Sequence, residues 1–260
     1  MGSGALIHAT AVVDPGAVIE PGVEIGPYAV IGPNVQIGAG TKIHPHAVID
    51  GNTTIGARCE IFPGAAIGLR CQDLKYGGET TYVRIGEGTT IREYVTVNSS
   101  TGEGGATVVG RNCLIMAYAH IAHNCVLGDE VIMANVASLS GHITIEDKAI
   151  LSGLVGVHQF VRIGTMSMTG GGSKVNADVP PYGLSDGNPC RVRGLNTVGL
   201  KRRNVPEATR AALHHAFKTL FFAGHPMNRA IELVEAEGPL LPEVEHLLEF
   251  VRTSERGIGR

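Results

Sequence analysis

The 260-residue sequence contains no tryptophan, and only 5 % of its residues are aromatic and 17 % charged. Its net charge is −3, so a general affinity for nucleic acid is not expected. No apolar stretch approaches the length of a membrane span, and no signal peptide is visible. These absences leave a globular protein without a nucleic-acid or membrane role as the expectation.

Cysteine is also sparse. The five cysteines are an odd number, and none forms the CxxC pair typical of zinc sites. Cys59, Cys113 and Cys125 fall where the repeat described below needs a small interior side chain, whereas Cys71 and Cys190 lie in irregular segments. We therefore expect no disulfide framework and a protein of the reducing cytoplasm.

What the sequence does contain is a repeat of six residues. A β-branched or long aliphatic residue occupies every sixth position, first without interruption at Ile7, Val13, Ile19, Ile25, Ile31, Ile37, Ile43, Ile49, Ile55, Ile61 and Ile67. The same phase returns at 85–97 and again at 109–163. Neither a helix nor a single strand has this period, which is typical of the hexapeptide-repeat parallel β-helix.

In such a solenoid three hexads form one triangular coil, so residues 18 apart become neighbours about 4.8 Å apart. The 36 glycines fit the turns between the short strands. Known hexad solenoids wind left-handed, and this resemblance implies the same hand here. We predict a mostly β protein, a left-handed parallel β-helix over residues 1–200, with a C-terminal α-helical cap over residues 201–260.

The repeat changes to a helical period near residue 204. Asn204, followed three residues later by Glu207, predicts a capping box at the start of a helix over residues 206–223. Two more amphipathic helices are expected over residues 227–237 and 242–252. The hexad pattern degrades after Ile163, and the prism is expected to close near residues 170–172 and 179–182.

Two segments interrupt the wall without changing its phase, at residues 69–84 and 98–108. Their six-fold positions hold Asp73, Glu79 and Glu103, which cannot line an apolar interior. We expect both segments to leave the wall as loops, and such loops often carry function.

Stacking brings a group of polar residues together beside these loops. Adding 18 to His123 gives Gly141 and then Gln159, and adding 18 to Asn124 gives His142. A histidine base, a glycine with an accessible backbone N–H and amide side chains are the parts that acyl transfer needs. We therefore predict a site on this column, to which His158 also belongs.

Three other interpretations remain open from the residues alone. The histidines could be solvated turn residues, or the prism could be a scaffold without catalysis. Alternatively, His120, His123 and His142 could hold zinc, as in a prism of the carbonic-anhydrase kind.

Several motifs carry a closer resemblance: QDLKYGGE (72–79), HIAHNC (120–125), SGH (140–142), VHQF (157–160), DVPPY (178–182), GN (187–188) and GLKRR (199–203). Together with the helical tail, they resemble the acyl carrier protein-dependent UDP-N-acetylglucosamine 3-O-acyltransferases of lipid A biosynthesis. The resemblance covers nearly the whole chain.

The resemblance implies transfer of a fatty acyl group, expected to be 3-hydroxyacyl, from acyl carrier protein to UDP-N-acetylglucosamine by a homotrimer. The reaction implied needs no metal or cofactor, and the thioester of acyl carrier protein is its co-substrate. His123 would be the general base, and Gly141 would stabilise the oxyanion. The other matching positions would contact the substrates: the nucleotide sugar by Asp73, His142, Gln159, Asn196 and Arg202, the acyl side by Lys75 and His120, and the end of the acyl chain by Gly171.

Three positions depart from the family pattern. Asn124 stands where aspartate is frequent, Val198 where glutamate is frequent, and Asn98-Ser99-Ser100 where a His-Arg pair is common. The related N-acyltransferase of the same pathway is the nearest rival. Two features count against this rival: the short segment before Ile7, and the GLKRR motif with its helical tail. The sequence leaves open the length of the acyl chain and whether the sugar carries a 3-hydroxyl or a 3-amine.

Overall fold

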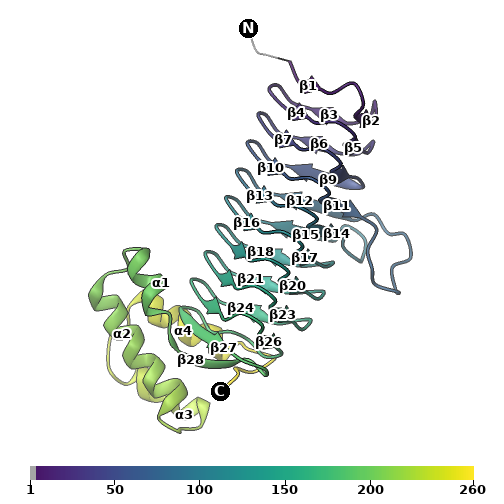
Figure 1. Cartoon of the computed structure of the whole chain (residues 1–260). Coiled ribbons are helices and arrows are strands. Elements are labelled where there is room, and N and C mark those ends of the chain that lie inside the picture. Colours follow the sequence, from purple (N-terminus) through teal and green to yellow (C-terminus); the bar gives the residue numbers. More distant parts are fainter. Residues whose placement is uncertain (1–3) are drawn as a thin grey trace.

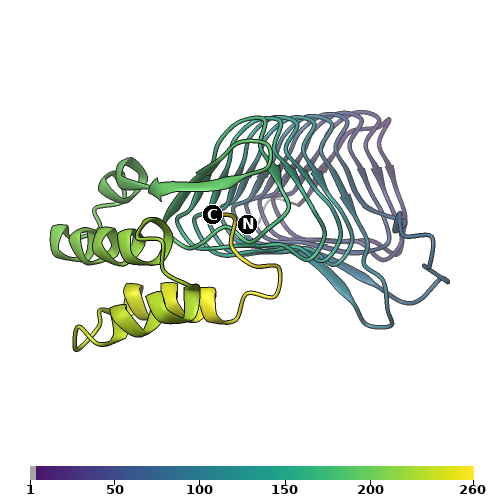
Figure 2. The same ribbon diagram turned by 90° about the horizontal axis from the view of Figure 1, so that it is seen from below.

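A ladder of short strands stacked along one axis dominates the chain (Figure 1). The structure is a computed structural model that describes residues 4–260, so residues 1–3 of the predicted prism lie outside the described residues. The view along the stack shows the coils superposed around a common interior, with the helices to one side (Figure 2). The predicted left-handed parallel β-helix with a C-terminal helical cap is confirmed.

Three sheets form the walls, and consecutive strands of the chain belong to different sheets. Sheet A consists of β1 Leu6–Ile7, β4 Glu24–Ile25, β7 Lys42–Ile43, β10 Glu60–Ile61, β13 Thr90–Ile91, β16 Leu114–Ile115, β19 Ile132–Met133, β22 Ile150–Leu151, β25 Met168–Thr169, β27 Gly183–Asp186 and β28 Arg191–Leu195. Only β27 and β28 in it pair antiparallel among the described residues.

Sheets B and C complete the triangle with parallel strands. Sheet B consists of β2 Val12–Val13, β5 Val30–Ile31, β8 Val48–Ile49, β11 Ala66–Leu69, β14 Thr96–Asn98, β17 His120–Ile121, β20 Ser138–Leu139, β23 Gly156–Val157 and β26 Lys174–Val175. Sheet C consists of β3 Val18–Ile19, β6 Gln36–Ile37, β9 Asn52–Ile55, β12 Tyr82–Ile85, β15 Ala106–Val109, β18 Val126–Leu127, β21 Thr144–Ile145 and β24 Arg162–Ile163.

The register follows from the repeat. His120 pairs with Ser138 and Ser138 with Gly156, each three hexads further along the chain. The residue at each six-fold position points inward: Ile31 is 1 % exposed and Ile121 is fully buried. Burying one such aliphatic side chain stabilises the fold by roughly 1.5–3 kcal/mol, so the repeat of apolar residues holds the stack together.

All five cysteines are free and buried. Cys59, Cys113 and Cys125 are at most 2 % exposed and lie in the interior at the fifth position of their hexads. Burial raises the pKa of the Cys113 and Cys125 thiols to about 11, which keeps them protonated.

The two predicted loops leave the wall at the same corner, between sheets B and C, which we call corner BC. One runs over residues 70–81, between β11 and β12, and the other over residues 99–105, between β14 and β15. Both are seen on one side of the stack in Figures 1 and 2. The prediction that these segments leave the wall is confirmed, with slightly narrower bounds.

The coils continue beyond Ile163, where the hexad pattern degrades. Beyond Ile163 the strands β25, β26 and β27 add to the stack, and residues 170–172 form a turn within it instead of closing it. Thr169, which is fully buried, occupies a six-fold inward position. The repeat was hidden there because the inward residue is polar.

The helical cap begins earlier than predicted, with α1 Thr197–Arg202. The remaining elements are α2 Glu207–Phe217, the π-helix η1 Lys218–Phe222, α3 Met227–Glu235 and α4 Pro242–Arg252. The predicted capping box is wrong: Pro206 precedes α2 without a side-chain cap, and Asn204 has a φ of 56°. The bounds of α4 are confirmed, and α3 ends two residues earlier than predicted.

The helices pack in a second core, which includes Leu213, Phe217 and Leu247 and extends to Tyr182 and Val192 at the end of the prism. After α4 the chain returns to the last coil, where Ile258 forms a parallel bridge with Asp178. No helix within residues 4–260 combines the length and the apolar character needed to cross a membrane.

Candidate active site

His123 lies at corner BC, and its imidazole has a defined tautomer. Nδ1 lies 2.9 Å from Oδ1 of Asn124. This amide oxygen can only accept, and it also accepts from the N–H (3.0 Å) and the hydroxyl (2.8 Å) of Thr101. Nδ1 must therefore carry the hydrogen, and Nε2 keeps a lone pair. With its side chain 15 % exposed, His123 is a partly sheltered base.

Asn124 joins this base to the loop over residues 99–105. Besides the two bonds that its oxygen accepts from Thr101, its Nδ2 donates to the Thr101 carbonyl oxygen (3.2 Å). An aspartate could accept the same bonds but could not donate the last one. The asparagine thus fits this position because both halves of its amide are used.

Gly141 lies directly beside the His123 ring, as the stacking of three hexads per coil predicts. A Cβ at this position would overlap the imidazole, so only glycine allows the ring to lie here. Gly141 is buried, and among the hydrogen bonds of the described residues none uses its N–H. An unused backbone N–H next to a base can stabilise an oxyanion.

The loop over residues 70–81 brings Asp73 to the other nitrogen of His123. Oδ2 of Asp73 lies 4.0 Å from Nε2, while its Oδ1 accepts from the Lys75 N–H (2.9 Å). The carboxylate and the base are too far apart for a good hydrogen bond. Both groups only accept, so a bound sugar could donate the hydrogen of one hydroxyl to Nε2 and that of a neighbouring donor group to Asp73. Lys75 is exposed on the same loop.

Two further histidines, His120 and His142, lie near His123. His120 bonds to the Thr96 hydroxyl (2.7 Å), and burial, followed by the charge of His123, lowers its pKa. His142 meets the His123 ring edge-on and stacks on Phe160 at 4.9 Å; burial and then His123 lower its pKa too. Both are therefore neutral near pH 7 and available as hydrogen-bond partners.

The remaining predicted residues occupy all three corners of the prism. His158 and Gln159 are exposed at corner BC, directly after β23. Gly171 follows β25 at corner AB, between sheets A and B. Arg202 belongs to α1, which meets the prism at corner CA, between sheets C and A, because Arg203 bonds to Glu130 there (3.0 Å). A single chain therefore does not bring all the predicted site residues together.

The amide of Asn196 is used within the protein. Its Oδ1 accepts from the Gly199 N–H (3.1 Å) and caps α1, and its Nδ2 donates to the Met166 carbonyl oxygen (2.9 Å). The side chain is buried, at 6 % exposed. Arg202, in contrast, is exposed at the end of the same helix. Of the two residues, the guanidinium is the one free to meet a ligand.

Gly171 differs from the glycines on either side. Gly172 has a φ of 69°, and a Cβ at Gly170 would lie 2.5 Å from Oδ1 of Asp186. A Cβ at Gly171 would come no closer than 3.4 Å, to the Gly153 carbonyl oxygen, and needs no left-handed backbone. The turn therefore does not require glycine at position 171.

Thr101 is the residue of this site that the sequence did not reveal. It lies 23 residues before Asn124, inside a loop, and the arithmetic of the repeat does not apply there. The only available signal was that the loop leaves the wall at the corner that holds His123.

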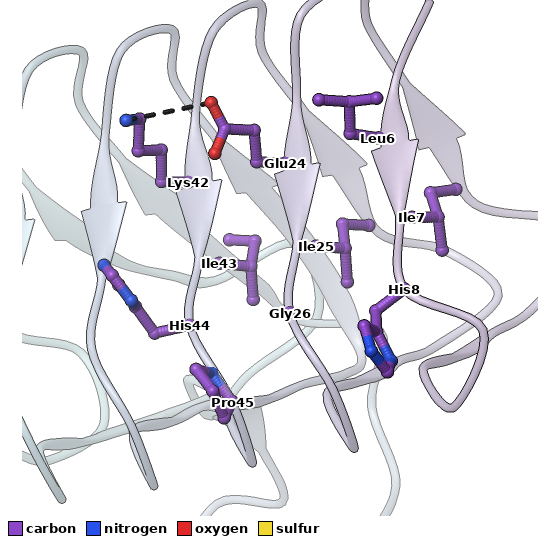
Figure 3. Close-up of a pocket in the computed structure, with 10 residues that line it drawn as sticks. All are labelled: Leu6, Ile7, His8, Glu24, Ile25, Gly26, Lys42, Ile43, His44 and Pro45. Atoms are coloured by element: carbon purple, nitrogen blue, oxygen red, sulfur yellow. Dashed lines mark ion pairs between the residues drawn. The ribbon is translucent and has the colours of Figure 1, made fainter.

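Two other places were candidates for a site: a metal centre and a groove on the first coils. In the described part of the chain, no group of three or more His, Cys, Asp or Glu side chains is arranged to hold a metal ion. A cavity of about 390 Å³ lies over β1, β4 and β7 at the N-terminal end, beside the ion pair of Glu24 and Lys42 (3.7 Å; Figure 3). Its lining contains none of the predicted site residues.

A parallel β-helix of hexads with a sheltered base beside a free backbone N–H defines the class of hexapeptide-repeat acyltransferases. Comparison agrees: residues 4–39 and 106–136 match the "Bacterial transferase hexapeptide (six repeats)" model. Residues 178–259 match "Udp N-acetylglucosamine O-acyltransferase; Domain 2". The chain belongs to the acyl-[acyl-carrier-protein]–UDP-N-acetylglucosamine O-acyltransferase family and is an acyltransferase.

Two of the relatives match along nearly their whole length. The enzyme of this name from Thermodesulfovibrio yellowstonii is 49 % identical over 255 residues, covering 98 % of this chain and 99 % of the relative. That from Janthinobacterium is 46 % identical, covering 98 % and 100 %. The structure of LpxA from Acinetobacter baumannii superposes with a TM-score of 0.94 at 44 % identity, covering 98 % of this chain and 100 % of that one.

Proposed function

We propose that this protein transfers a fatty acyl group from the thioester of acyl carrier protein to the 3-hydroxyl of UDP-N-acetylglucosamine. The names of its relatives supply the two substrates. The observation that carries the mechanism is the proximity of two groups. His123 Nε2 has a free lone pair, and the neighbouring Gly141 has an unused backbone N–H. The geometry suits a general base acting next to an oxyanion site.

In this reaction His123 removes the proton of the 3-hydroxyl through Nε2 while the oxygen attacks the thioester carbonyl. The carbonyl oxygen becomes an oxyanion, to which the Gly141 N–H donates. When the intermediate collapses, the C–S bond breaks and the thiolate of the carrier protein takes the proton from the imidazolium. Asn124 holds the ring throughout by accepting from Nδ1.

The substrate contacts follow from the positions of the other residues. Asp73, close to Nε2, would hold the sugar, together with His142 and Gln159 from the same corner. Lys75 and His120 would lie along the acyl side. A 3-hydroxyacyl group fits the family resemblance. No metal or other cofactor takes part in this proposal.

The assembly that fits these positions is a homotrimer. Residues at corners BC, AB and CA of one chain cannot surround one substrate, whereas prisms side by side would place different corners across a seam. The side chain of Leu74, on the loop beside Asp73, is fully exposed at 102 %. Such an apolar side chain on a projecting loop is suited to a pocket of a neighbouring copy. We propose that the protein acts in the cytoplasm.

His123→Ala tests the mechanism. Loss of a general base should lower acyl transfer by about 10²–10⁴-fold, while light scattering and circular dichroism show an intact trimer. The assay is mass spectrometry of the acylated UDP-sugar with a panel of acyl carrier protein thioesters. Near-full activity of the pure variant would overturn the role of His123.

The same assay with a 3-amino analogue of the UDP-sugar separates an oxygen from a nitrogen acceptor. Treatment with a strong chelator should leave the rate unchanged. A requirement for stoichiometric zinc would overturn the base mechanism.

A further inference from the structure

The segment after α4 is fastened to the last coil of the prism on both sides of Arg256. On one side the Ser254 hydroxyl donates to Oδ2 of Asp178 (2.7 Å). On the other side the Asp178 N–H donates to the Gly257 carbonyl oxygen (2.8 Å). Asp178 is only 2 % exposed, and its Oδ1 accepts from the Arg162 N–H (2.8 Å). The backbone at Arg256 is therefore held in place on both sides.

From this backbone the Arg256 guanidinium reaches corner BC. Its Nη2 lies 3.1 Å from Nδ1 of His158 and donates to the Asn176 carbonyl oxygen (3.2 Å). Asn176 lies one coil beyond His158 along the stack. The contact joins residues 98 positions apart, and it reaches the histidine next to Gln159 in the column of His123.

The contact decides which nitrogen of His158 carries the hydrogen. Guanidinium groups only donate, so Nδ1 accepts from Arg256 and the hydrogen is on Nε2. A competing partner is present, because the Gln159 carbonyl oxygen lies 3.3 Å from the same Nδ1. That oxygen only accepts, so it would favour the opposite tautomer, with the hydrogen on Nδ1.

We propose that Arg256 is a positioning residue that keeps His158 in the Nε2–H tautomer, as a hydrogen-bond donor towards an acceptor oxygen of the bound substrate. This role rests on the proposed acyltransferase function. The helical cap thereby contributes to the site on the prism through the segment that follows its last helix. Without Arg256, the His158 ring turns its Nδ1–H to Gln159 and leaves Nε2 unable to donate.

The tautomer can be measured directly by ¹⁵N magnetic resonance of histidine-labelled protein without substrate. In the wild type Nδ1 of His158 should be unprotonated. In Arg256→Met the hydrogen should move to Nδ1, and Arg256→Lys should restore much of the wild-type pattern because an ammonium group also donates. Unchanged His158 resonances in a folded Arg256→Met protein would overturn the proposal.

Kinetics supply the second measurement. Arg256→Met should lower kcat/KM by about three- to tenfold, the effect of losing one hydrogen bond, and should add no loss in a His158→Ala background. Arg260→Met is the matched control, because this arginine donates to the His225 carbonyl oxygen within the helical cap. It should behave as wild type.

The outcomes separate the two proposals. If Arg256→Met lowers activity equally with and without His158, the positioning role is wrong and the acyltransferase function stands. If no acylated UDP-sugar forms with wild-type protein, the proposed function fails, while the ¹⁵N resonances still report whether Arg256 sets the tautomer.

Discussion

The same corner of the prism is built in two different ways along the stack. In the first two coils, the turn after the sheet B strand has proline at its third hexad position, as Pro15 and Pro33, and the third coil has Gly51 there. In the coils above the loops, the equivalent positions hold His123, Gly141 and Gln159. The backbone pattern of strand, turn and strand is the same in both regions.

The difference shows which positions of a hexad are free for chemistry. The inward residues and the small fifth position are fixed by packing in both regions, whereas the third hexad position lies at the corner, outside the apolar interior. A proline there stiffens the turn but has no N–H. Gly141 offers an N–H, and the loops over residues 70–81 and 99–105 shelter it together with His123. The lower corner thus offers only a turn, whereas the upper corner offers the groups that the proposed catalysis needs.

After removal of His123 itself, the largest effect should come from filling the space beside the base. Gly141→Ala places a methyl group where the His123 ring lies, and a displaced base should lower kcat/KM by about 10²-fold. Pro33→Ala, at the equivalent position of a lower coil, should leave turnover unchanged. Steady-state assays on both folded variants check this. Equal activities would remove the distinction between the two regions.

Two neighbouring arginines above the loops, Arg202 and Arg203, should differ in role: one should affect substrate binding and the other stability. Arg202→Ala should raise the KM for the UDP-sugar about tenfold with little change in kcat, because a planar guanidinium suits phosphate. Arg203→Ala, which breaks the contact to Glu130, should instead lower the melting temperature. If the KM for acyl carrier protein alone rises in Arg202→Ala, this arginine docks the protein partner.

A smaller effect is expected for Asn124→Asp. Aspartate keeps the acceptor role towards His123 and Thr101 but loses the bond to the Thr101 carbonyl oxygen, so kcat/KM should fall by no more than about threefold. A carboxylate stabilises the imidazolium, which raises the pKa of the base. Since the neutral base is the active form, activity should disappear at a higher pH on acidification. A loss above 100-fold would make the amide donor essential.

The smallest effect on overall rate is expected for Gly171→Met, assayed with the shortest thioesters. The site accepts a Cβ without strain, so the melting temperature should hold while preference shifts towards shorter acyl chains. Gly172→Ala is the control: its φ of 69° should cost roughly 1 kcal/mol of stability without changing chain preference. Equal losses on every chain length would contradict the role of Gly171.

The sequence predicted those contacts that the repeat enforces. Because every uninterrupted coil consists of three hexads, the neighbours of His123 and Asn124 could be calculated, and the structure confirms that Gly141 and His142 lie beside them. The loops were found because acidic residues broke the apolar series. Packing physics alone determines these features, so they are readable from residue types and spacing.

Contacts outside the repeat could not be calculated. Thr101 and Arg256 reach the site from a loop and from the segment after α4, where no period relates position to space. The helix α1 was missed because its capping residue, Asn196, has no glutamate or glutamine at the third helical position to complete a capping box. Asn204, which has Glu207 three residues later, matches the capping-box pattern without capping α2.

The bond between Asp178 and Ser254 has a consequence for the order in which the molecule forms. Each coil of the prism contacts the coil synthesised just before it, so the stack can grow step by step behind the ribosome. The bond from Ser254 joins residues 76 positions apart and must wait until α4 has emerged. The column around His123 can therefore assemble before the segment carrying Arg256 arrives, and a chain halted between these moments would lack the contact between Arg256 and His158.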